Sequence, residues 1–77
     1  MSKSETGVIN LTREQKIGNR LRMLRGVHTL NEVAGALGVT RQAVSHYETG
    51  RRTPNDKMKV AIADYYGKSV QEIFFAD

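Results

Sequence analysis

Four hydrogen-bonding side chains stand close together in the segment GVTRQAVSHYETG, at positions 38–50 of this sequence. Arg41 and Gln42 are adjacent. Ser45 and His46 follow one turn later, so on a helix all the side chains named here share one face. Arginine can donate two hydrogen bonds to guanine, and glutamine can pair in a bidentate manner with adenine. An ordinary solvated helix carries similar residues, so the surrounding elements must decide between the two interpretations.

The residues around this segment predict two short helices joined by a tight turn. The first is expected over Leu30–Leu37, after a capping box in the sequence TLNE, and it ends at Gly38. The second is expected over Arg41–Glu48, after a cap at Thr40, and it ends at Gly50. A three-residue break that begins with glycine is typical of a helix-turn-helix.

Small and branched apolar residues occupy the inward faces of these two helices. Ala34 falls where the two helices approach each other, and this close approach leaves no space for a large side chain. The remaining apolar positions, expected to hold the pair on the core, are Val33, Leu37, Val44 and Tyr47. The polar set at positions 41, 42, 45 and 46 is then left to face outward.

Three further helices complete an all-α prediction. They are expected over Arg13–Arg25, from about residue 56 to Tyr66, and as a last turn or two between Ser69 and Phe75. Gly18 weakens the first helix and is tolerated best where another helix passes close. The polar residues 1–10 are expected to be a flexible arm, and residues 11–77 a single domain.

Composition limits the classes of function. The 77 residues include no cysteine, and 12 Lys and Arg oppose 8 Asp and Glu for a net charge of +4. Such a chain has a modest core without a deep cleft, and its charge fits nucleic acid or ordinary solvation. It has neither a signal peptide nor a membrane span, so a cytoplasmic protein is expected.

The inventory of reactive residues argues against an enzyme. There is no P-loop, no acidic cluster and no supported set of serine, histidine and acid. Asp56 and Asp64 have the ordinary spacing of surface charges. His46 has only His28 as a second histidine, so no metal site is expected. No cofactor or small-molecule ligand is expected either.

The pattern IGNRLRMLR…TLNEVAGALGVTRQAVSHYETGRRTP…AIADYYGKSVQEIF resembles the Cro/repressor-type (XRE-like) helix-turn-helix family of phage and bacterial transcription regulators. The resemblance covers about residues 17–75. Its most specific parts are A-x-x-x-G-V at 34–39, V-S-x-Y-E-x-G at 44–50, and Pro54. It implies a compact five-helix bundle of the lambda-repressor-like type, whose third helix enters the DNA major groove.

The resemblance also implies roles for individual residues. The implied base contacts are Arg41, Gln42, Ser45 and His46. The implied phosphate contacts are Asn31, Thr40, Thr49, Arg51 and Arg52. Arg25 and Glu48 match an ion pair that ties the first helix to the third, which makes Glu48 structural.

The sequence departs from the family pattern at three positions. Leu30 stands where many members have glutamine, so one expected phosphate or base-positioning contact is missing. Asp56 and Lys59 stand where leucine is common, so the fourth helix is expected to pack more loosely or to begin later.

Two functions follow from this reading. The first is a sequence-specific DNA-binding transcription regulator, a Cro-like repressor whose partner is double-stranded operator DNA. The alternative is a small modulator of the same fold, a co-repressor, antirepressor or antitoxin that acts on a partner regulatory protein. The apolar residues near the C-terminus, assigned either to capping the core or to contact with a second copy or partner, are Val70, Phe74 and Phe75.

Overall fold

The computed structural model describes residues 11–76, which form four α-helices and a short π-helix with no strand among them. The elements are α1 (Arg13–Arg25), α2 (Leu30–Leu37), α3 (Arg41–Thr49), α4 (Asp56–Tyr66) and the π-helix η1 (Gln71–Phe75). The predicted all-α architecture is confirmed, and α3 continues one residue beyond its expected end. The arm expected at residues 1–10 lies outside the described residues, as does Asp77.

Each α-helix begins where a polar side chain accepts a hydrogen bond from the backbone three residues later. Thr12 and Thr29 form complete capping boxes. Thr40 accepts from the backbone N–H of Ala43 at 3.0 Å. Asn55 caps α4 by accepting a hydrogen bond from the backbone N–H of Met58 at 2.8 Å. Local sequence therefore determines where these helices start.

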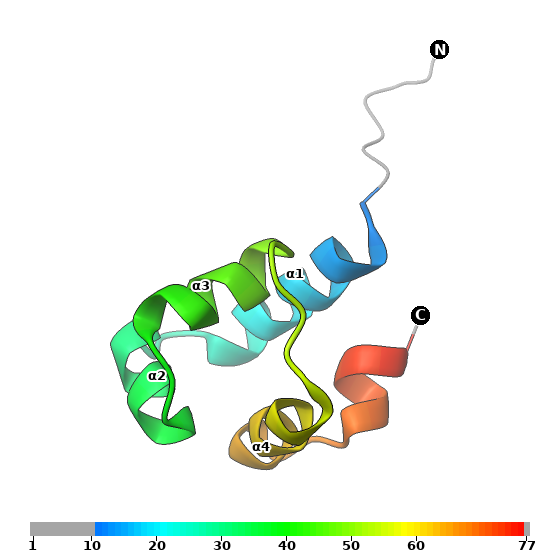
Figure 1. The fold of residues 1–77 in the computed structure, drawn as a ribbon. Helices are drawn as coiled ribbons and strands as arrows, with labels where there is room; N and C mark the ends of the chain where they lie inside the picture. The colour runs from blue at the N-terminus through cyan, green and yellow to red at the C-terminus, as the bar shows by residue number, and fades with distance from the viewer. Residues whose placement is uncertain (1–10, 77) are drawn as a thin grey trace.

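The helices pack so that α3 crosses α1 on one side and lies beside α2 on the other. The fourth helix lies against α2, and η1 lies against α1 near its start (Figure 1). Gly18 allows the close approach of α1 and α3, because a methyl group there would lie 2.7 Å from the carbonyl carbon of Glu48. The backbones of the two helices therefore meet directly at this glycine.

Two adjoining groups of buried side chains form the core. One group lies between α1, α4 and η1 and contains Leu21, Ile62, Ala63, Ile73 and Phe74. The other joins α2 to α3 and contains Val33, Ala34 and Val44. The partly buried side chains that contact both groups are Leu37 and Tyr66.

The assignment of Phe74 to a partner surface is wrong. Its side chain is only 2% exposed and belongs to the core, and Val70 packs against that core. The physical reason lies on α1, where Arg20 donates hydrogen bonds to the backbone carbonyls of Ile73 and Ala76 and so holds η1 with Phe74 inward. Phe75, which is 46% exposed, is the residue of this trio that remains on the surface.

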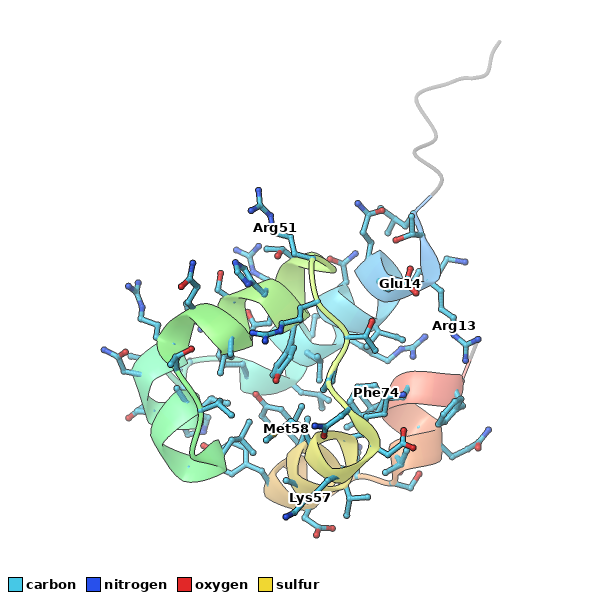
Figure 2. The ribbon with its side chains drawn as sticks, viewed as in Figure 1. Arg13, Glu14, Arg51, Lys57, Met58 and Phe74 are labelled. Carbon is cyan, nitrogen blue, oxygen red and sulfur yellow. The ribbon has the colours of Figure 1, made fainter. Side chains whose placement is uncertain are left out.

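Lys59 contributes to packing despite its charge. Its ammonium group lies 5.7 Å from the ring centroid of Phe74 and 5.4 Å from that of Phe75, within the range of a cation–π interaction. The polar residue expected to loosen α4 therefore covers an edge of the core (the Phe74 ring is labelled in Figure 2).

No helix within residues 11–76 combines the length and apolar character needed to cross a membrane.

Candidate nucleic-acid interface

The outer face of α3 borders a shallow open hollow, called here the α3 hollow. It is lined by Leu30, Thr40, Arg41, Gln42, Ser45 and His46. Arg41 and Gln42 are exposed, whereas Ser45 and His46 are half-buried. None of the side chains at positions 41, 42, 45 and 46 hydrogen-bonds to another residue within the described part of the chain. In Figure 2, side chains along α3 project outward on the side of the molecule that carries Arg51.

The inner face of α3 fixes the orientation of this polar set. Ala43 and Val44 are buried at 6% and 3% exposure, so the helix cannot roll without exposing them. Gly38 turns the chain from α2 into α3 with a φ of 70°, a left-handed conformation that favours glycine. The turn and the two buried side chains therefore present positions 41, 42, 45 and 46 outward, as expected.

An ion pair joins the far end of α3 to α1. Nε of Arg25 donates to a carboxylate oxygen of Glu48 at 2.7 Å, and the Nη2 group donates to the other oxygen at 3.0 Å. Arg25 also donates to the backbone carbonyl of His28 at 2.8 Å. The hydrogen bond to Glu48 raises the pKa of the Arg25 guanidinium above its ordinary value. Glu48 is buried, and its charge is compensated by this pair.

Comparison with known proteins agrees with this geometry. A family model described as a helix-turn-helix domain matches residues 16–73. The chain belongs to this helix-turn-helix family. A segment of 58 residues is 34% identical to an uncharacterised HTH-type transcriptional regulator of Methanocaldococcus jannaschii, covering 73% of this chain and 88% of that protein.

A solved structure supports the same assignment. The crystal structure of the clp gene regulator ClgR from C. glutamicum superposes with a TM-score of 0.72 at 26% identity. The match covers 83% of this chain and 86% of the other. The resemblance to XRE-like regulators is therefore confirmed, and the protein is a DNA-binding transcriptional regulator with a helix-turn-helix formed by α2 and α3.

The residues assigned to phosphates surround this helix-turn-helix but differ in the hydrogen bonds that they can offer. Asn31, Arg51 and Arg52 are exposed, and their side chains make no hydrogen bond or ion pair with the rest of residues 11–76. The Thr40 hydroxyl can still donate a hydrogen bond to a phosphate, because in the cap its oxygen acts only as an acceptor. The Thr49 hydroxyl instead donates to the Ser45 carbonyl at 3.0 Å, so a phosphate contact there needs a rotation of the side chain.

Two residues beside α3, one on α1 and one on α2, were not assigned a contact from the sequence. Arg22 and Leu30 border an adjoining hollow, whose other lining residues are Arg25, Ser45, Glu48 and Thr49. Arg22 precedes Arg25 by three positions and so shares its face of α1, which was a usable signal. Arg20, in contrast, is bound to the carbonyls at the C-terminal end.

No cluster of three or more histidine, cysteine, aspartate or glutamate side chains with the geometry of a metal site occurs within residues 11–76. Polar contacts between the elements include the Arg25–Glu48 pair and the hydrogen bond from Arg20 to the Ile73 carbonyl.

Proposed function

We propose that this regulator is a Cro-like repressor that binds operator DNA in a sequence-specific manner, with α3 in the major groove. The observation that carries the proposal is the α3 hollow, where four outward hydrogen-bonding side chains stand on a helix fixed by buried contacts and the Arg25–Glu48 pair. A major groove admits an α-helix and presents a distinct pattern of donors and acceptors for each base pair.

The base-reading roles divide according to the chemistry of the side chains. The exposed guanidinium of Arg41 suits the two acceptors of guanine, and the amide of Gln42 suits the donor and acceptor of adenine. Ser45 and His46 lie one turn further along α3 and reach the next bases. We assign Arg22, Arg51 and Arg52 to phosphates, because cations outside the groove add affinity without sequence information.

Substitution at the start of α3 tests direct readout. Sites selected from a random duplex pool supply the operator. Arg41→Ala and Gln42→Ala are each expected to weaken its binding about fivefold to 150-fold, because a bidentate pair discriminates by roughly 1–3 kcal/mol. Lys57→Ala, which removes an exposed cation on the opposite side of the molecule from Arg51 (Figure 2), should bind like the parent. Equal affinity of the parent and both α3 variants would show that α3 does not read the bases.

We infer that two copies bind a two-fold symmetric operator, with half-sites about 34 Å apart. The exposed ring of Phe75 supports an apolar contact between copies at the C-terminal end. A cytoplasmic location and the absence of catalysis are part of the same proposal. Symmetry in the selected sites, together with sedimentation of the protein–DNA complex, tests the two-fold arrangement.

The second candidate function is a modulator that binds a partner regulatory protein. The side chains of Met23 and Val27 favour it, because they are 83% and 96% exposed at the end of α1 and in the turn after it. Binding to random duplex at low salt distinguishes the two functions. A repressor that grips phosphates binds measurably and loses affinity as salt rises, whereas a modulator shows no affinity even at low salt.

A further inference from the structure

Leu30 is the one apolar side chain in the lining of the α3 hollow. It is also the one apolar side chain in the lining of the adjoining hollow that reaches Arg22. As the first residue of α2 it stands beside Ser45 in both linings, within the polar surface proposed to read bases. Against the family pattern this leucine is a lost contact, but its position in the structure calls for a different explanation.

Packing holds the leucine in a fixed place. One side of Leu30 lies against the core group formed by Val33, Ala34 and Val44, so the side chain is half-buried. The capping box of Thr29 and Glu32 fixes the start of α2, with hydrogen bonds of 2.8 and 3.1 Å between the two residues. The outer side of the leucine is therefore offered to the hollow from a rigid support.

The major groove contains a single kind of apolar group at the base edges, the methyl group on C5 of a pyrimidine. A leucine placed against polar base edges would remove water from those edges without giving them a hydrogen bond in return, which costs free energy. We propose that Leu30 recognises a pyrimidine C5-methyl group in the major groove, next to the base contacted by Ser45. This inference rests on the proposed function, because it specifies what part of the operator the α3 hollow reads.

Atomic substitution in the DNA isolates the methyl group. Each thymine of the selected operator is replaced in turn by deoxyuridine, which removes only the C5-methyl, and the Kd of the parent protein is measured for each duplex. Replacement at one position is expected to weaken binding about fourfold, which corresponds to about 0.8 kcal/mol for one buried methyl-sized group. The Leu30→Ala variant is expected to bind the thymine duplex more weakly than the parent does. It should bind the thymine and deoxyuridine duplexes equally well.

Matched variants separate recognition from folding. Leu30→Met keeps an apolar side chain of similar volume and should retain the preference for the methyl group. Leu30→Gln keeps a good helix former of similar length but places a polar group in the hollow, and it should lose the preference. Val27→Ala removes an aliphatic side chain that is 96% exposed outside both hollows, and it should keep the parent's preference. Thermal unfolding of each variant shows that it remains folded.

Two sources of the methyl group are distinguished in the same experiment. Cytosines of the operator are replaced in turn by 5-methylcytosine. A loss on deoxyuridine substitution assigns the methyl to thymine, and a fourfold gain on methylation of a cytosine assigns it to 5-methylcytosine. Either result supports the proposal when Leu30→Gln abolishes it.

The results that overturn the inference differ from those that overturn the function. If the parent binds its operator with no preference for a C5-methyl at any position, or if Leu30→Gln retains the preference, Leu30 is not a methyl contact while operator binding stands. If the parent binds no duplex at low salt, the proposed function fails and the inference fails with it.

Discussion

Tyr66 joins the two core groups and lies near the C-terminal end of α3. Its side chain is partly buried, and it lines a small internal space together with Glu48. Burial, followed by the nearby charge of Glu48, raises the pKa of the Tyr66 phenol from 10.0 to about 12. Ionisation of this one side chain therefore opposes the packing of α3 and α4 together.

The sign of this shift predicts how stability depends on pH. Because the folded protein holds the phenol proton more tightly than the unfolded chain does, this contribution is complete below pH 10 and is lost as pH rises toward 12. Between pH 10 and 11, urea denaturation of Tyr66→Phe should show a smaller loss of stability than denaturation of the parent. Equal losses in the parent and in Tyr66→Phe would show that Tyr66 makes no such contribution.

Helix limits were readable from the sequence because caps and glycines act within a few residues. Thr29 with Glu32, and Ser69 with Glu72, form the hydrogen bonds that their spacing predicts. Hydrogen bonds from Ser69 also lower the pKa of the Glu72 carboxyl. The helix-turn-helix and its outward polar set follow from this local information combined with apolar periodicity.

The orientation of η1 was not readable in the same way. Arg20 is 53 positions from the Ile73 carbonyl that it binds, and no local pattern indicates this contact. Phe74 and Phe75 are adjacent and chemically identical, so tertiary contacts of this kind decide which ring is buried. The hollow that Arg22 and Leu30 share likewise depends on how α1 and α2 pack against α3.

The packing of α1 on α3 predicts opposite effects for two glycine substitutions. Gly18→Ala should destabilise the protein by about 1–3 kcal/mol, because the added methyl group would lie 2.7 Å from the Glu48 carbonyl carbon and must push the helices apart. Gly35→Ala in α2, with no atom within 4 Å of the added methyl group, should stabilise it by about 0.5–1 kcal/mol. Urea denaturation measures both changes. Stabilisation by both substitutions would show that the two helix backbones do not meet closely.

The net charge of +4 conceals an uneven use of cations over the whole molecule. Arg20 and Arg25 bind groups inside the fold, and Lys59 lies over two aromatic rings. Arg51 and Arg52 are exposed in the loop after α3, without a partner among residues 11–76. The position of each Arg and Lys side chain therefore indicates more about the DNA-binding surface than the total charge does.

This distribution predicts which cations determine the salt dependence of DNA binding. Each neutralised phosphate contributes about 0.9 to the slope of log Kd against log salt concentration, so Arg51→Gln combined with Arg52→Gln should reduce the slope by about 1.8. The double variant should weaken binding to operator and to random duplex by similar factors, because phosphates carry no sequence information.

Lys57→Gln removes one exposed cation on the opposite side from Arg51 (Figure 2) and should leave the slope unchanged. Titrations at three or more salt concentrations measure these slopes. If the double variant has the parent's slope, the phosphate contacts lie elsewhere than Arg51 and Arg52. If Lys57→Gln lowers the slope, the DNA contacts the side of the molecule that carries Lys57 in α4.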